Sequence, residues 1–172
     1  MQRRSELQNA AELSSIEPEH TFPDNAKLEF LKKHLRKDLL VGHLNINSLQ
    51  NKYEELTATI KTMGAHVMFI SETKIDSSYL NTQFSIPGYS LYRNDGKKGG
   101  GGIVALVSFS LAKKRLKPTE NYKTLELIAL EIKTDACNTV IIGIYHLPRN
   151  LCSDYQLLLE NKLSQVCNWA SL

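Results

Sequence analysis

The chain has 172 residues, a formal net charge of +3 and 42% hydrophobic residues. This length allows one domain with a real core, although it is short for an α/β enzyme built on two sheets. The mild net charge does not establish a nucleic-acid partner, because local clusters of charge matter more than the total. The three cysteines lack CxxC or Cys/His spacing, which argues against a disulfide framework or a zinc site and favours an intracellular, reducing location, the nucleus or the cytoplasm.

The N-terminal part of the chain is polar and without periodicity. Residues 1–23 predict a flexible leader, followed by a domain over residues 24–172. No segment has the apolar length of a signal peptide or a membrane span. A helix is expected to begin at Asp24 or Asn25 and to run to about residue 37, because leucines recur on one face of that segment.

The next part of the chain predicts a strand, a helix and a second strand. The first strand is expected over Leu39 to Leu44. Ser48 is expected to cap a helix whose apolar residues recur every three or four positions until Gly64 ends it. The second strand is expected over residues 66–71. This order indicates an amphipathic crossover helix between two strands.

Beyond residue 71 the pattern changes to short β segments separated by turn residues. Strands are expected at residues 84–92, 103–109, 125–133 and 139–145, and a last helix is expected from Ser153 or Asp154. The resulting order is α, β, α, β, then four β and a final α. It predicts an α/β layered protein with mixed strand directions.

Polar residues end two of the apolar runs. Asn45 follows the run that ends at Leu44, and Glu72 comes just after the run from Val67 to Ile70. A carboxylate in such a place is costly to bury unless a cation or a hydrogen-bond donor meets it. Together with the string GIY, which ends at Tyr145, these residues indicate part of a metal-dependent phosphodiesterase site.

Five strings in the chain resemble a known family. In their order and spacing they are similar to the endonuclease/exonuclease/phosphatase superfamily, and within it to the endonuclease domain of LINE-type non-LTR retrotransposons. The resemblance implies a DNase I-like α/β sandwich, with a mixed sheet, flanking helices and a second sheet that is incomplete in this N-terminal part. The strings are LNINSLQNK at 44–52, HVMFISETKI at 66–75, FSIPGYSLYRND at 84–95, KKGGGGIVALVS at 97–108 and IIGIYHLPRN at 141–150.

The resemblance implies a role for each of the three site residues. Asn45 would assist metal and phosphate binding, Glu72 would be the Mg²⁺ ligand, and Tyr145 would hydrogen-bond near the attacked phosphate. Mg²⁺ prefers oxygen ligands and keeps much of its water shell, which suits a carboxylate. Each residue also has an ordinary interpretation, as a turn former, an exposed strand end and a packed phenol respectively. For one shared site, the three strands are expected to lie in one sheet with converging C-terminal ends.

The chain departs from the family in two respects. His146, Leu147 and Pro148 follow the tyrosine where the family commonly has Arg-Pro-Pro. No string resembles the GDFN segment, which orients the attacking water, or the SDH segment, whose histidine acts as base or stabilises the transition state. His43, His66 and His146 are expected to be incidental rather than relocated catalytic groups. The sequence therefore predicts an incomplete domain, inactive as this isolated chain, with the reverse transcriptase domain of the same element expected downstream.

The parent activity implied by the resemblance is Mg²⁺-dependent hydrolysis of DNA phosphodiester bonds, which nicks a target site. Arg93, Lys97 and Lys98, with the cluster from Lys113 to Lys117, are the candidate contacts to DNA, although solvated Lys-rich loops have the same composition. Two alternatives stay open. One is a non-catalytic nucleic-acid-binding remnant, and the other is a phosphatase of the same fold that acts on a small phosphoester.

An incomplete second sheet also has a structural consequence. We expect the faces that carry Ile128, Leu130, Ile132 and Ile141 to be under-covered. Exposed apolar faces and unpaired sheet edges promote association, so self-association is expected.

Overall fold

The computed structural model describes residues 38–97, 99–118, 125–134 and 137–146, together with two helical residues, Asn161 and Ser164. Three of the expected segments lie outside these residues: the leader, the helix after it and nearly all of the C-terminal helix. The division of the chain into a leader and a domain therefore stays a prediction.

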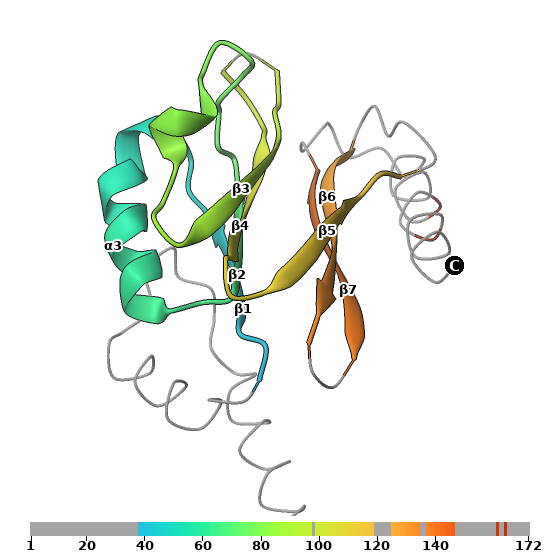
Figure 1. The fold of residues 1–172 in the computed structure, drawn as a ribbon. Helices are drawn as coiled ribbons and strands as arrows, with labels where there is room; N and C mark the ends of the chain where they lie inside the picture. The colour runs from blue at the N-terminus through green and yellow to red at the C-terminus, as the bar shows by residue number, and fades with distance from the viewer. Residues whose placement is uncertain are drawn as a thin grey trace, which may run out of the picture.

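Four strands form a mixed sheet in the spatial order β1-β2-β4-β3 (Figure 1). β1 and β2 are parallel and end together, with Asn45 opposite Ser71. β4 runs antiparallel to both β2 and β3. The expected α/β class with mixed strand directions is confirmed. The strands of this first sheet are β1 (Val41–Asn45), β2 (Val67–Ser71), β3 (Tyr89–Asn94) and β4 (Ile103–Ser108).

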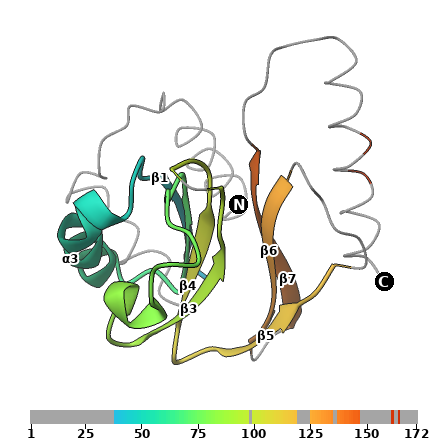
Figure 2. The same ribbon diagram turned by 90° about the horizontal axis from the view of Figure 1, so that it is seen from above.

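One α-helix, α3 (Tyr53–Met63), connects β1 to β2 and covers the outer face of the first sheet (Figures 1 and 2). A 3₁₀ helix, η2 (Gln50–Lys52), precedes it. The predicted end at Gly64 is confirmed, because Gly64 has a φ of 61° and donates its N–H to the carbonyl of Ile60 at 2.9 Å. No helix in the described part of the chain is long and apolar enough to cross a membrane.

The predicted cap at Ser48 is wrong. Ser48 has a φ of 95° and donates its backbone N–H to the carbonyl of Glu72 at 2.9 Å. Leu49 donates to the carbonyl of Thr73 in the same way, at 2.9 Å. The residues after β1 therefore pair with the residues after β2, and α3 begins later, after Lys52, without a side-chain cap.

The segment expected as one strand over residues 84–92 is divided in two. Residues Asn81–Phe84 form a short 3₁₀ helix, η3, and β3 begins only at Tyr89. Gly88, with a φ of 90°, turns the chain between them. The buried side chain of Phe84 anchors this segment in the core beneath α3.

A second sheet is antiparallel and lies against the face of the first sheet opposite α3, as Figure 2 shows. It contains β5 (Ala112–Leu116), β6 (Leu125–Lys133) and β7 (Asn138–His146), in the order β5-β6-β7. β5 was not expected, because its sequence AKKRL carries three successive charged residues. Such charges are common on edge strands, where they oppose pairing with other molecules.

The inner face of the second sheet is buried. Side chains alternate along a strand, and in β6 this places Ile128, Leu130 and Ile132 toward Phe69 of the first sheet. None of the three isoleucine and leucine side chains is more than 1% exposed, and Ile141 packs against the same cluster. The expectation that these residues are under-covered is therefore wrong, because the first sheet covers them. The apolar face that suggested self-association is not observed in the described part of the chain.

Gly143 of β7 marks a close approach between the sheets, since a Cβ added there would lie 2.1 Å from Cδ1 of Phe69. We expect Gly143→Ala to lower the free energy of unfolding by about 1–3 kcal/mol, because the ring or the sheet must shift. Urea unfolding followed by circular dichroism measures this change. The control is Gly100→Ala, where an added Cβ meets nothing within 4 Å and the change should stay within about 0.5 kcal/mol. Equal losses in both variants would contradict the expected contact.

Candidate metal and phosphate site

The side chains of Asn45, Glu72 and Tyr145 meet at one point between the two sheets. Nδ2 of Asn45 donates to Oε1 of Glu72 at 2.9 Å, and the hydroxyl of Tyr145 donates to the same oxygen at 3.2 Å. The three residues are therefore close together, as expected. The expected single sheet is wrong, because β7 belongs to the second sheet. Tyr145 reaches Glu72 because it lies on the face of β7 that packs against the first sheet.

The backbone at Glu72 has an unusual conformation. Its φ is 54°, in the left-handed region that residues other than glycine seldom adopt, and the φ of Lys74 is 53°. Each such residue costs about 1–3 kcal/mol and persists only where the surrounding structure holds it. On one side the residues after β1 hold this segment, and on the other Thr73 donates its N–H to the carbonyl of Gly102 at 3.2 Å.

Asn45 is oriented by its own loop. Its Oδ1 accepts the backbone N–H of Asn47 at 3.2 Å, which leaves Nδ2 to face Glu72. Asn47, with a φ of 49°, shapes the turn. As placed, Asn45 supplies a donor that fixes the carboxylate. Direct metal binding by Asn45 would use its oxygen, and that role stays a prediction.

Tyr145 acts as a hydrogen-bond donor at neutral pH. Burial, the charge of Glu72, the hydrogen bond to Glu72 and the charge of Glu126 together raise the pKa of Tyr145 to about 12. The phenol is therefore protonated over the physiological range. The hydroxyl donates its proton in the hydrogen bond to the Glu72 carboxylate.

Glu126 is a second carboxylate at this site, and the sequence interpretation missed it. It lies opposite Tyr145 in the pairing of β6 with β7, and its Oε2 accepts the backbone N–H of Gly102. Burial raises the pKa of Glu126, the bond from Gly102 opposes that rise, and the charge of Asp95 adds to it. Parity along β6 gave no decisive signal, because Leu127 and Ala129, which alternate with Glu131, are buried as well as Ile128.

The guanidinium of Arg93 is fully engaged within the chain. Its side chain is 10% exposed and forms a two-point ion pair with Asp95. All five N–H donors have acceptors, so phosphate binding by Arg93 would require some of these bonds to break. That role stays a prediction. The acceptors are the two carboxylate oxygens of Asp95 at 2.9 and 2.7 Å, the carbonyls of Tyr79 and Asp76 at 2.8 Å each, and Oδ1 of Asn81 at 3.0 Å.

The other basic residues differ in their surroundings. Lys97 is exposed in a turn, and Lys98 lies outside the described residues. Nζ of Lys113 lies 5.3 Å from the ring centre of Phe109 and donates to a backbone carbonyl at the end of β4. Arg115 donates to the carbonyl of Arg93 at 3.0 Å. Several of the donors expected to face phosphate therefore have partners within the chain.

His43 of β1 and His66, which precedes β2, have structural partners. Nε2 of His43 lies 3.1 Å from Oγ of Ser71, and burial lowers the pKa of His43. Nδ1 of His66 accepts the backbone N–H of Leu40 at 3.0 Å. That both residues are incidental to catalysis stays a prediction.

The carboxylate oxygens of Glu72 are of the kind that a hard divalent cation prefers. Both of the side-chain hydrogen bonds to this carboxylate end on Oε1, and among the described residues none is formed by Oε2. Mg²⁺ is commonly held by one or two carboxylates together with water and substrate phosphate. The described residues contain no group of three or more His, Cys, Asp or Glu that would enclose an ion. Glu72 would therefore hold the ion by Oε2, with much of the coordination left for water and phosphate.

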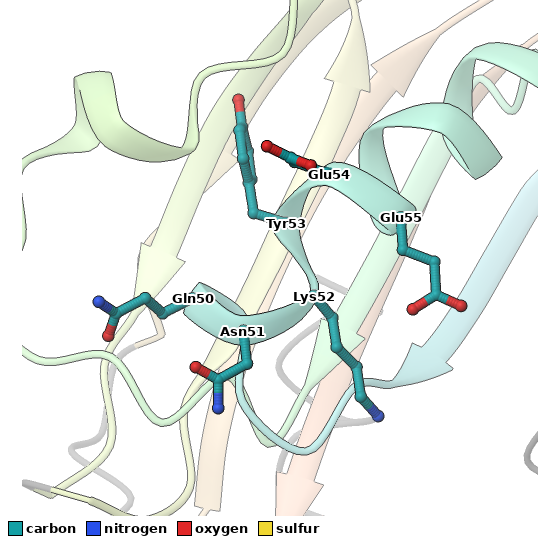
Figure 3. Close-up of a pocket in the computed structure, with 6 residues that line it drawn as sticks. All are labelled: Gln50, Asn51, Lys52, Tyr53, Glu54 and Glu55. Carbon is teal, nitrogen blue, oxygen red and sulfur yellow. The ribbon is translucent and has the colours of Figure 1, made fainter.

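A separate pocket opens at the start of α3 (Figure 3). Six consecutive residues, 50–55, line it, and none of the three site residues does. Oε1 of Gln50 also accepts the hydroxyl of Tyr79 at 2.9 Å. The site at Glu72 is therefore distinct from this pocket.

Comparison with solved structures identifies the fold. An AP endonuclease from Archaeoglobus fulgidus aligns with a TM-score of 0.55 and 18% identity, over 76% of this chain and 50% of its own. The chain has a DNase I-like fold. Two structures of D. rerio TDP2, one humanized by 14 mutations and one in complex with a single-strand DNA product, align with TM-scores of 0.53 and 0.50 and identities of 12% and 11%. They cover 74% of this chain and 58% and 54% of their own.

The endonuclease domain of TRAS1, a telomere-specific non-LTR retrotransposon, aligns with a TM-score of 0.47 and 17% identity, over 71% of this chain and 51% of its own. No protein-family model and no curated protein matches the sequence. The DNase I-like chain spans about half the length of the solved structures that it matches. At identities this low the structural similarity establishes the fold alone, and the activity has to be argued from the site.

Replacing Glu72 by glutamine tests the geometry of the site. We expect Glu72→Gln to lower the pKa of Tyr145 from about 12 toward its ordinary value of about 10, because a negative charge is removed. Phenolate absorbance, taken as the difference between each protein and the same protein carrying Tyr145→Phe, measures this pKa. Glu131→Gln, on the other face of β6, should leave it unchanged.

The raised pKa of Tyr145 also makes the free energy of unfolding depend on pH. The pKa of Tyr145 is higher in the folded state, so its contribution to stability is complete below about pH 10 and is lost as pH rises through about 12. A Tyr145 titration that is the same with and without the Glu72 charge would contradict the observed contact.

Proposed function

We propose that this chain supplies the metal- and phosphate-binding half of an endonuclease of the retrotransposon type, which hydrolyses DNA phosphodiester bonds with Mg²⁺. One observation carries the proposal. A carboxylate, an amide and a phenol converge between the two sheets, where Glu72 has two donors on one oxygen and its other oxygen left for an ion.

The three residues have complementary parts in the proposed reaction. Glu72 would hold the ion, which when bound would supply polarisation of the scissile phosphate and stabilisation of the leaving oxygen. Asn45 keeps the carboxylate in one orientation through Nδ2. Tyr145, protonated at neutral pH, fixes the same carboxylate from the second sheet. In the proposed reaction its hydroxyl also lies near the attacked phosphate.

Two lines of support favour DNA as the substrate. Solved structures with the same fold include an endonuclease and a TDP2 in complex with a single-strand DNA product. The five strings that resemble LINE-type endonucleases favour nicking of a target site. A reverse transcriptase domain in the same polypeptide and a nuclear or cytoplasmic location stay predictions from the sequence.

The strings that the resembling family uses to activate water are not found in this sequence. The sequence has no GDFN-like or SDH-like string, and His43 and His66 have structural partners. We therefore propose that the attacking water is oriented by a part of the protein outside this sequence. The metal site can be tested without that part.

Metal binding is the direct test of Glu72. We expect Mn²⁺, used as a paramagnetic probe for Mg²⁺, to bind the 172-residue chain and to be displaced by Mg²⁺. Glu72→Gln should weaken Mn²⁺ binding at least about tenfold, because the ligand oxygen loses its charge. Electron paramagnetic resonance of free Mn²⁺ measures the affinity. Glu131→Gln is the matched control, and an equal affinity for both variants would exclude Glu72 as the ligand.

Plasmid nicking tests the division of the catalytic groups. We expect the 172-residue chain not to nick supercoiled plasmid above background, because an oriented base contributes about 10²- to 10⁴-fold to the rate. A longer chain with GDFN and SDH segments should nick, and Glu72→Ala should abolish the nicking. Robust Mg²⁺-dependent nicking by the 172 residues would show that the required groups have been misjudged.

Two further assays, of DNA binding and of phosphate release, separate the alternatives. Salt-dependent retention of DNA by the longer chain without any turnover would favour a nucleic-acid-binding remnant. Release of phosphate from a small ester would favour a phosphatase of the same fold.

A further inference from the structure

The side chain of Glu126 is partly buried on the inner face of the second sheet. It shares that face of β6 with Ile128 and Leu130, and it is opposite Tyr145 on β7. A carboxylate in such a place needs a donor. The donor is the backbone N–H of Gly102, which belongs to the segment that leads into β4 of the other sheet.

The Gly101–Gly102 segment fits closely beneath this carboxylate. A Cβ at Gly101 would lie 2.5 Å from Oε1 of Glu126, and a Cβ at Gly102 would lie 2.2 Å from Oγ1 of Thr73. The two glycines have φ values of 71° and 90°, which favour glycine on their own account. The contact between the carboxylate and this segment therefore depends on the absence of a side chain at Gly101, and the close approach of the segment to Thr73 depends on its absence at Gly102.

The same glycines hold the backbone that follows Glu72. The carbonyl of Gly102 accepts the N–H of Thr73 at 3.2 Å, and the carbonyl of Gly101 accepts the N–H of Lys74 at 2.8 Å. In this segment Glu72 and Lys74 have the left-handed conformation, which persists only where neighbours hold it. The contact from the second sheet therefore extends, through two glycines, to the backbone of the candidate metal ligand.

We propose that Glu126 is a positioning residue, which fixes the Gly101–Gly102 segment and thereby sets the placement of Glu72 relative to the hydroxyl of Tyr145. The inference rests on the proposed function, because Glu72 is the metal ligand there. The paired positions of Glu126 and Tyr145 explain how the second sheet acts twice on Glu72. Tyr145 holds the carboxylate, and Glu126 holds the backbone beneath it.

Two substitutions separate the length of the Glu126 side chain from its charge. Glu126→Gln keeps the length and an oxygen that accepts the N–H of Gly102, whereas Glu126→Asp keeps the charge and draws the carboxylate back. We expect the Mn²⁺ affinity of Glu126→Gln to stay close to that of the parent chain, and that of Glu126→Asp to fall about tenfold or more, as for outer-shell partners of a metal ligand. Glu131→Asp, on the opposite face of β6, should have no effect. The proposal would be overturned if Mn²⁺ affinity were retained in Glu126→Asp and lost in Glu126→Gln, or if neither substitution changed it.

A readout without metal separates this proposal from the function on which it rests. The side-chain amide signals of Asn45 in nuclear magnetic resonance report on its hydrogen bond to Glu72. We expect them to shift in Glu126→Asp and in Gly101→Ala, whose Cβ displaces the carboxylate, and to keep their positions in Glu126→Gln. Unchanged Asn45 signals in the Asp and Ala variants would overturn the positioning role. Failure of the parent chain to bind Mn²⁺, with the expected shifts present, would overturn only the metal proposal.

Discussion

The site depends on the burial of β2 on both of its faces. One face of β2 packs beneath α3 and the other packs against the second sheet, so all five of its residues are buried. The chain therefore leaves β2 in a place where polar groups need partners. The backbone after β2 forms hydrogen bonds with the residues after β1 and with the Gly101–Gly102 segment. The carboxylate of Glu72 forms them with Asn45 and Tyr145.

Much of this fold could be predicted from local patterns, and the errors have physical reasons. Apolar runs identified β2, β4 and β6 and helical spacing identified α3, because burial leaves a mark on the sequence. β5 has no such mark, since it is a charged edge strand paired with β6. The sheet to which β7 belongs could not be predicted, because a strand's own residues do not specify its neighbours.

The candidate site was predicted in part. Asn45, Glu72 and Tyr145 lie in strings that resemble a family, and each follows or ends an apolar run. Glu126 lies in an apolar strand that also carries Glu131, and only the packing of the two sheets shows which of the two points inward. Arg93 resembles a phosphate contact in sequence because most of its acceptors lie more than ten residues away.

The hydrogen bonds to Glu72 come from opposite sides of the inter-sheet core. Asn45 belongs to the first sheet and Tyr145 to the second, so neither sheet alone can assemble the group. The group of three side chains is therefore complete only when the two sheets are packed together. The distance between the sheets, limited where the ring of Phe69 meets Gly143, also sets how closely Tyr145 approaches Glu72. Residues that never approach a substrate can thus alter the site by changing how closely two layers stack.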